Sequence, residues 1–263
     1  MSNRIYAMMS RYVILVMGSV PRMLSIFYWP SVQIILWGFF SNYLIQNSSS
    51  NNFSSLSFLL SAIILWDILF RAQLGLSMTF FEELWSRNLG HLLITPLRTY
   101  ELVISLVLAS ILRTFLGLGP AILVANFFFD FDLFELGVYL IFFFINLIFM
   151  GWSIGFVVCG LVLRYGQAFE ELAWAFIFIL LPFSCVYYPI DALPSFFQNV
   201  ALILPPVYVF EGMRSIINEN IIQFDLLYYS LIINLVYFVL SLVVFTKMIN
   251  LCRKNGNLFN LGE

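Results

Sequence analysis

The stretch LGVYLIFFFINLIFMGWSIGFVVCGLVL, residues 136–163, decides the fold class of this chain. It contains no Asp, Glu, Lys or Arg. An uncharged apolar stretch of about 20 residues is long enough to cross a bilayer as a helix. The whole chain of 263 residues is 62% hydrophobic and 10% charged, whereas soluble domains carry about 25% charged residues. We therefore expect an all-α integral membrane protein, with residues 1–263 forming a single transmembrane domain.

Further apolar stretches bring the number of predicted membrane spans to six. They cover residues 23–45, 56–79, 102–125, 136–163, 172–188 and 226–246. The polar loop QNSSSNNFSS separates the first two spans, and Pro182 falls inside the fifth. The two halves of the sequence do not resemble each other, although transporters built from inverted repeats often show such similarity. We therefore expect a single bundle that forms a dimer.

Residues 1–22 precede the first span and contain only a short apolar run. Arg4 and Arg11 flank IYAMMS, and Pro21-Arg22 interrupts the apolar run that follows. This pattern predicts an interfacial helix on the membrane surface, with its arginines at the level of the lipid headgroups. A cleaved signal peptide is the alternative, but no A-x-A cleavage pattern follows the run.

The distribution of lysine and arginine predicts the orientation. With six spans, Arg71 and Arg113 fall inside spans, and only Arg214 falls in a loop on one side of the membrane. The other side holds Arg4, Arg11, Arg22, Arg87, Arg98, Arg164, Lys247, Arg253 and Lys254. Basic residues mark the cytoplasmic side, so both termini are expected in the cytoplasm. The net charge of −2 gives no indication of a nucleic-acid partner.

The segment 189–221, between the fifth and sixth spans, is apolar but cut by prolines. Its unbroken part, 195–204, is too short to cross a membrane. Interrupted apolar segments exist at membrane depth only where protein or a cavity shelters them. We expect one or two short helices that re-enter the membrane from the outer face. The alternative is a seventh span, which would place the C-terminus outside.

The segment FFEELWSRNLGHLLITPLR, residues 80–98, is charged and lies between long apolar runs. On a helix from Phe81 to Leu93, one stripe would hold Phe81, Leu84, Trp85, Leu89, Leu92 and Leu93. The opposite stripe would hold Glu82, Glu83, Ser86, Arg87, Gly90 and His91. Glu83 and Arg87 have the favourable i,i+4 spacing, and Pro96 should end the helix with Thr95 extended. We expect a flat cytoplasmic helix, which either anchors two spans or docks a cytosolic partner.

The order of these segments resembles the membrane subunit of type-2 ABC exporters. An interfacial helix, two spans, a cytoplasmic EELWSRN…LLITPLR segment and four further spans follow one another in the same order. The first predicted span, with YWPSVQIILWGF at 28–39, is similar to that of one branch of these permeases. The piece LPPVYVFEGMR resembles the family's P-l-x-x-x-x-E-x-x-R segment, represented here by Pro206, Glu211 and Arg214.

This resemblance implies roles for two groups of residues. The cytoplasmic segment would be the coupling helix that contacts the ATPase, through Phe81, Glu82, Glu83, Leu84, Trp85, Arg87 and His91. The outer re-entrant helices would close the exit, with Pro205, Pro206, Glu211 and Arg214 at an external gate. The resemblance further implies a bacterial inner-membrane exporter of drugs, lipids or polysaccharides. Two copies of the chain would join a separate ATPase subunit that binds ATP and Mg²⁺.

The chain offers no phosphate-binding loop of its own. A Walker A loop needs GxxxxGK[ST] to hold phosphates, and the only lysines, Lys247 and Lys254, precede Met and Asn. We therefore expect no enzyme activity, cofactor or metal in this chain by itself. The three cysteines are scattered and form no CxxC, so they indicate neither a disulfide framework nor a zinc site.

Two further patterns invite a catalytic interpretation. GWSIG at 151–155 matches the GxSxG nucleophile elbow, but no strand precedes it and the only histidine, His91, lies outside the spans. We interpret it as a small-xxx-small packing motif in which Ser153 bonds locally. The paired carboxylates Glu170 and Glu171 are interpreted as a solvated loop.

Three charged residues, Asp67, Arg71 and Arg113, fall inside predicted spans, where charges are costly. They form either a structural bridge, Asp67 with Arg71 or Arg113, or a polar point on a substrate path. Pairing of Asp67 with one arginine would leave the other arginine as an excess positive charge, which is compatible with an anionic substrate or headgroup. An ion-coupled secondary transporter that uses these charges is the alternative function. A membrane scaffold or intramembrane enzyme is the third.

Overall fold

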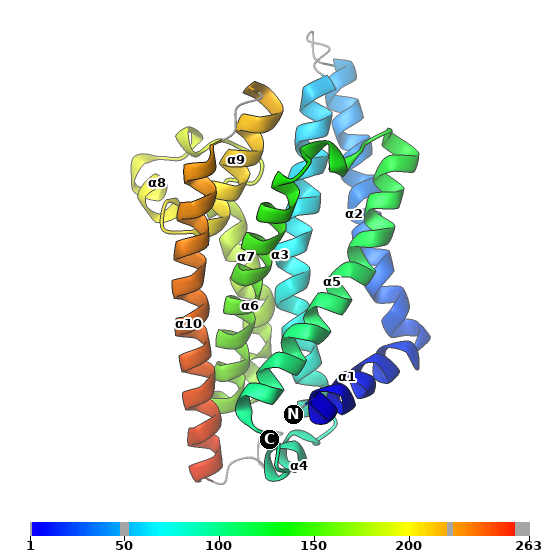
Figure 1. Ribbon diagram of the computed structural model, residues 1–263. Helices are drawn as coiled ribbons and strands as arrows, with labels where there is room; N and C mark the ends of the chain where they lie inside the picture. Colours follow the sequence, from blue (N-terminus) through cyan, green and yellow to red (C-terminus); the bar gives the residue numbers. More distant parts are fainter. Residues whose placement is uncertain (1, 48–52, 220–222, 256–263) are drawn as a thin grey trace.

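The computed structural model of the chain describes residues 2–47, 53–219 and 223–255, and within these ranges all of its regular secondary structure is helical, without strands (Figure 1). Its long helices are α1 (Ser2–Met17), α2 (Val20–Asn47), α3 (Phe53–Trp85), α5 (Thr99–Phe129), α6 (Tyr139–Tyr165) and α10 (Phe224–Asn255). Shorter helices are α4 (Leu89–Ile94), α7 (Leu172–Phe183), α8 (Ser195–Ala201) and α9 (Pro205–Glu219). Single 3₁₀ turns are η1 (Leu133–Leu136), η2 (Gln167–Glu171) and η3 (Ile190–Ala192). The middle of the predicted polar loop, residues 48–52, lies outside the described residues.

Among the described residues, five helices are long and apolar enough to cross a membrane. They are α2, α3, α5, α6 and α10, and a sixth span exists if the bent pair α8 and α9 is counted as one. This confirms the prediction of an all-helical integral membrane protein. The number of spans agrees with the prediction only in part.

The predicted fifth span, 172–188, is longer than the helix that forms there. The helix α7 ends at Phe183 and has 12 residues, which gives it a length of about 18 Å, against about 30 Å of hydrocarbon. Pro182 stands in its last turn, and Cys185 adopts a left-handed conformation with a φ of 53°. The chain therefore turns after α7 and does not continue as a straight helix.

The segment after α7 forms a short helical pair at the end of the molecule opposite α1 (Figure 1). The helix α8 has seven residues, and the pair α8–α9 is bent by 100°. Such a bend does not give a straight seventh span. Re-entry of this pair into the membrane stays a prediction.

The helices α3 and α6 form the centre of the bundle. In the most apolar stretch of α3, 78% of the residues are buried, whereas the corresponding share is 17% in α2. GWSIG lies in α6 against α3: a Cβ on Gly151 would lie 2.7 Å from the carbonyl oxygen of Leu69. The hydroxyl of Ser153 donates to Phe149 O at 2.7 Å. These contacts confirm that the motif is a close helix-packing site.

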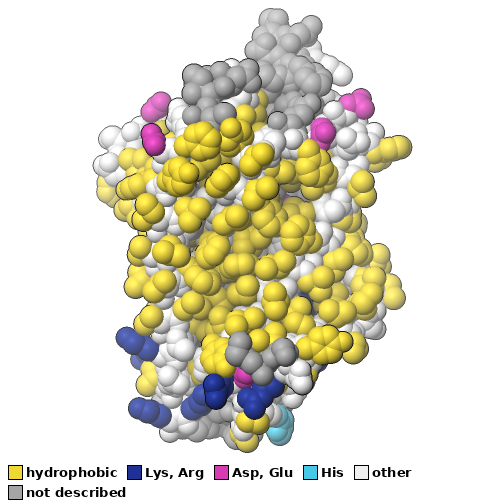
Figure 2. All heavy atoms as spheres, viewed as in Figure 1, with side chains coloured by type: hydrophobic (Ala, Val, Ile, Leu, Met, Phe, Trp, Pro, Cys, Tyr) yellow, Lys and Arg dark blue, Asp and Glu magenta, His cyan; other side chains and the backbone are white. Residues whose placement is uncertain are grey.

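Charged side chains separate between the two ends of the bundle, with a wide hydrophobic zone between them (Figure 2). Lys and Arg gather at the end that carries α1 and the last turns of α10, here called the basic end. Asp and Glu are conspicuous at the other end, where α8 and α9 lie. This division is the one that the loop charges predict for a protein in a bilayer.

Candidate functional site

The predicted amphipathic helix Phe81–Leu93 is wrong as a single helix. Instead, α3 continues past the apolar core to Trp85, and α4 begins at Leu89. Arg87, between them, has a left-handed φ of 54°. The N–H of Arg87 donates to Leu84 O at 2.9 Å, and that of Asn88 donates to Glu83 O at 3.0 Å. This pair of bonds is the Schellman arrangement that ends helices, so α3 stops here although the apolar pattern continues.

The second part of the segment follows the sequence prediction more closely. The helix α4 ends at Ile94, Thr95 has an extended conformation (φ −63°, ψ 160°), and Pro96 follows. His91 is exposed on α4, as predicted, while Gly90 is buried, which the predicted polar stripe did not anticipate.

Glu83 does not face solvent, contrary to its place on the predicted polar stripe. Its side chain is 2% exposed and accepts hydrogen bonds from Arg11 Nη2 at 2.9 Å and from Asn88 Nδ2 at 2.7 Å. The predicted pair of Glu83 with Arg87 is therefore wrong. The i,i+4 geometry requires a continuous helix, and the left-handed turn takes Arg87 off the face that holds Glu83.

Glu82 is likewise turned into the protein. Arg113 Nη2, from α5, lies 2.7 Å from Glu82 Oε2, and Arg22 Nε, at the start of α2, lies 3.9 Å from Oε1. Arg113 thus has a carboxylate partner, so the expected excess positive charge inside the spans is wrong. A charge of this kind is tolerated at depth because it is paired.

We call Glu82 and Glu83, with their partners Arg11, Arg22, Asn88 and Arg113, the α3-end cluster. It joins α1, α2 and α5 to the last turn of α3. Tyr12 of α1 is 2% exposed and its hydroxyl has no hydrogen-bond partner among the described residues. Burial, followed by the neighbouring Glu83 carboxylate, raises the pKa of Tyr12, so this hydroxyl stays protonated.

Three exposed polar side chains follow Glu82 and Glu83 in the sequence. Ser86, Arg87 and His91 are exposed, while Phe81 and Leu84 are buried. We call Ser86, Arg87 and His91 the exposed turn. The side chains of the exposed turn are accessible from outside the protein. The ion pairs of the α3-end cluster, directly before the turn in the sequence, connect this part of the chain to α1, α2 and α5.

Trp85, which was predicted on the apolar stripe, is not packed into the protein core as Phe81 and Leu84 are. It is 51% exposed, and its indole N–H donates to both carboxylate oxygens of Glu170, in η2, at 2.9 Å. The bond connects the end of α3 to the connection between α6 and α7. No spacing in the sequence relates these two residues, which are 85 positions apart.

Asp67 and Arg71 form the bridge that was one of the two sequence interpretations. Arg71 Nε lies 2.5 Å from Asp67 Oδ2, one turn away in α3. Both side chains are largely buried. The alternative partner, Arg113, lies with Glu82 instead. The predicted group of three charges is therefore divided between two separate sites.

Glu211 and Arg214 form an ion pair that connects several segments at the opposite end of the molecule. Arg214 Nη1 lies 2.6 Å from Glu211 Oε1, and Arg214 Nη2 donates to Cys185 O at 3.1 Å. The backbone N–H of Ile190 donates to Glu211 at 2.9 Å, and the Arg214 guanidinium lies 5.0 Å from the Phe58 ring centre. The pair ties the turn after α7 to α9 and α3.

The two prolines of the predicted gate begin α9. Pro205 is the first residue of that helix and Pro206 the second, positions where a missing N–H costs nothing. Both are buried. The carbonyl oxygen of Pro205 accepts from the Ser230 hydroxyl of α10 at 2.9 Å. This places the proline pair at a junction between α9 and α10.

A polar network that the sequence prediction missed joins α6 to α10. Ser230 Oγ lies 2.9 Å from Asn146 Oδ1 and shares its one proton between this oxygen and Pro205 O, while Asn234 Nδ2 donates to Asn146 Oδ1 at 3.0 Å. All three side chains are buried. The sequence feature that could have predicted this network is the presence of two amide side chains, Asn146 and Asn234, inside long apolar runs. Such residues form hydrogen bonds between helices in membranes.

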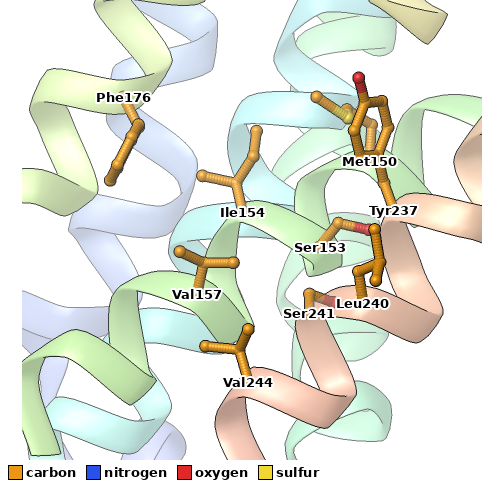
Figure 3. Close-up of a pocket in the computed structure, with 9 residues that line it drawn as sticks. All are labelled: Met150, Ser153, Ile154, Val157, Phe176, Tyr237, Leu240, Ser241 and Val244. Carbon is orange, nitrogen blue, oxygen red and sulfur yellow. The ribbon is translucent and has the colours of Figure 1, made fainter.

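An apolar pocket of about 220 Å³ lies between α6, α7 and α10 (Figure 3). Its lining comprises Met150, Ser153, Ile154, Val157, Phe176, Tyr237, Leu240, Ser241 and Val244. The hydroxyls of Ser153 and Ser241 are bonded to carbonyls of their own helices. The wall therefore offers hydrocarbon contact and few free hydrogen bonds.

Comparisons with known proteins place these features in context. Residues 5–218 match the family described as ABC-2 type transporter. The chain is 25% identical over 168 residues to the inner membrane transport permease YadH of Escherichia coli strain K12. The same identity holds for the protein of that name in Shigella flexneri. These matches cover 62% of this chain and 63% of the relative, so just under two thirds of each relative is spanned.

Proposed function

The chain belongs to the ABC-2 type transporter family, and from that premise we propose that it is the membrane-spanning permease subunit of an ATP-driven exporter. The observation that supports this most strongly is the family match over residues 5–218, which includes the apolar helices α2, α3, α5 and α6 and the exposed turn. ATP would be hydrolysed, with Mg²⁺, by a separate subunit, because the two lysines of this chain do not stand in a Walker A loop.

We assign ATPase coupling to the exposed turn, which lies at the basic end. Ser86, Arg87 and His91 face solvent, so a cytosolic protein has direct access to them. The buried carboxylates Glu82 and Glu83 lie immediately before them, bonded to arginines of α1, α2 and α5. A push on the turn would therefore reach three other helices through ion pairs, without passing through a flexible loop.

The two carboxylates are therefore not part of the proposed docking surface. Glu82 and Glu83 would transmit force and keep the turn in place, while Arg87 and His91 would contact the ATPase. Trp85, through its bond to Glu170, would hold the second connection at the same end. Orientation with the basic end in the cytoplasm follows from the excess of Lys and Arg there.

For the substrate we propose an amphipathic or lipid-linked molecule that is moved outward. The pocket between α6, α7 and α10 fits an apolar chain because its wall is hydrocarbon. The Glu211–Arg214 pair and the start of α9 would form the outer gate. Two copies of the chain would assemble in a bacterial inner membrane, with the transport route at their interface.

The decisive experiment is co-purification of the tagged chain from membranes, followed by an ATPase assay. Recovery of a nucleotide-binding subunit with ATPase activity is expected. Replacement of Arg87 and His91 by Glu should then remove that subunit while the permease itself stays folded, because both side chains are exposed. The matched control is replacement of Arg253 and Lys254 by Glu, since these are also exposed bases, in the last turn of α10.

Two results would refute this assignment. If the tagged chain never recovers a nucleotide-binding subunit, the permease function fails. If the subunit is recovered equally with the Arg87 and His91 replacements, the exposed turn is only an anchor. Charge reversal at Glu82 or Glu83 is unsuitable for this purpose, since it would disrupt the α3-end cluster itself.

An ion-coupled secondary transporter is the alternative function. It requires a carboxylate inside the membrane that exchanges an ion during the cycle. Asp67 lies 2.5 Å from Arg71, and Glu82 lies 2.7 Å from Arg113, so each carboxylate has a fixed cation as its counter-charge. Transport that continues in ATP-depleted vesicles and follows an imposed ion gradient would favour this alternative.

A further inference from the structure

The helix α2 contains a proline within its membrane-crossing part. Pro30 is buried and lies inside the apolar stretch Val20–Tyr43. A proline has no backbone N–H, so it cannot donate to the carbonyl four residues earlier, and its ring displaces that carbonyl. In α2 this carbonyl belongs to Ile26. A backbone carbonyl without a donor is costly in hydrocarbon, so its partner has to be found elsewhere.

The donor for Ile26 comes from another helix. Nη1 of Arg71, in α3, donates to Ile26 O at 3.1 Å, across 45 positions of sequence. A charged donor makes a stronger hydrogen bond than a neutral one. The hydroxyl of Ser31 donates to the next carbonyl, that of Phe27, at 2.8 Å, a bond that is often found where helices bend. Side chains thus bond to two consecutive carbonyls beside the proline.

Arg71 is fixed in the position that this bond requires. On its own helix, Nε of Arg71 lies 2.5 Å from Asp67 Oδ2. On the side of α5 it passes over Gly117, where a Cβ would lie 2.7 Å from Cζ and closer still to Nη1. A residue larger than glycine at 117 would occupy the space of the guanidinium. Three helices therefore meet at this one side chain.

We propose that Arg71 is a positioning residue for α2, which supplies from α3 the hydrogen bond that Pro30 removes. Asp67 orients the guanidinium, and Gly117 leaves room for it. The direction of α2 on either side of Pro30 is then set by α3, although α2 has few buried residues of its own. This role does not depend on what the chain transports.

A double-mutant cycle between the proline and the ion pair tests the proposal. The substitutions are Pro30→Ala, which restores the missing N–H, and the combined change Asp67→Leu and Arg71→Met, which removes the ion pair without leaving a lone charge. The measurement is thermal unfolding of the protein in lipid nanodiscs.

With Pro30 present, removal of the ion pair should lower the melting temperature by about 4 °C, because the Ile26 carbonyl is left without a hydrogen-bond donor. In the Pro30→Ala background, removal of the pair should lower the melting temperature by at most half as much. Equal losses in both backgrounds would overturn the proposal, since Arg71 would then act only as the partner of Asp67.

A second experiment is informative even if the combined variants do not fold. Spin labels at Leu24 and Phe40, both exposed on α2 on either side of Pro30, report the bend of the helix in a background without the three native cysteines. Gly117→Ala should shift or broaden the distance distribution, because it displaces the guanidinium. Gly119→Ala is the matched control, since a Cβ there meets nothing within 4 Å. Identical distributions for Gly117→Ala and the unsubstituted protein would refute the role of Arg71.

Discussion

Glu82 of α3 and Arg113 of α5 form an ion pair of 2.7 Å, although 31 residues separate them in the sequence. Both side chains are largely buried, at 12% and 13% exposure. The pair joins the last turn of α3, just before the exposed turn, to a neighbouring membrane helix. A contact at this point connects the part of the protein that reaches solvent to the part that lies in the bilayer.

Replacement of Arg113 by Leu should destabilise the protein by about 2–3 kcal/mol, because the Glu82 carboxylate would stay buried with only Arg22 at a longer distance. Thermal unfolding in nanodiscs measures this. The double variant with Leu at both positions should be more stable than Arg113→Leu alone, since no lone charge is left. An unchanged melting temperature for Arg113→Leu would contradict the pair. Unchanged transport by an assembled variant would exclude Arg113 from the substrate path.

Replacement of Gly151 by Ala should destabilise the bundle by about 1–3 kcal/mol. The added Cβ would lie 2.7 Å from Leu69 O and 2.8 Å from the Ala72 Cβ, and neither of these atoms is a flexible side-chain end. The control is Gly119→Ala in α5, which has open space and should be neutral or stabilising by about 0.5–1 kcal/mol. Equal melting temperatures of the two variants would show that α6 does not pack on α3 this closely.

Replacement of Asn234 by Leu should cost about 1 kcal/mol, because its amide donates to Asn146 in the interior between α6 and α10. Asn250→Leu is the matched control, since this residue lies in the same helix and is exposed. Unfolding in nanodiscs compares the two. A loss for Asn250→Leu as large as that for Asn234→Leu would mean that the interhelical bond contributes nothing specific.

The sequence was sufficient for the long helices and for the charge difference between the ends. Hydropathy and loop charge are properties of a segment by itself, so runs such as 136–163 could be recognised without knowledge of their neighbours. The small-xxx-small interpretation of GWSIG was correct for a similar reason. Gly151 and Gly155 indicate close packing whichever helix is the partner.

The sequence was not sufficient where the outcome depended on tertiary partners. Glu82 and Glu83 look like members of a solvated polar stripe until Arg113 and Arg11 approach from other helices. The amphipathic pattern of 81–93 continues smoothly through Arg87, and only the backbone bonds of the Schellman arrangement reveal the break. A spacing rule such as i,i+4 assumes that the helix continues, so one left-handed residue made the predicted pair of Glu83 with Arg87 wrong.

Replacement of Trp85 by Phe should loosen the basic end without unfolding the protein. An aromatic ring is kept, but the indole N–H that donates to Glu170 is lost, so the end of α3 and η2 lose their direct hydrogen bond. Since Trp85 is half exposed, the cost in global stability should be only about 1 kcal/mol. Hydrogen exchange of the backbone should become faster in α4 and in η2, which are short helices with low local stability.

Glu170→Gln is the control, because its side-chain carbonyl still accepts from the indole and should preserve most of the protection against hydrogen exchange. Unchanged exchange in Trp85→Phe would mean that the two connections hold their positions independently, and that a push on the exposed turn is not shared with the second connection.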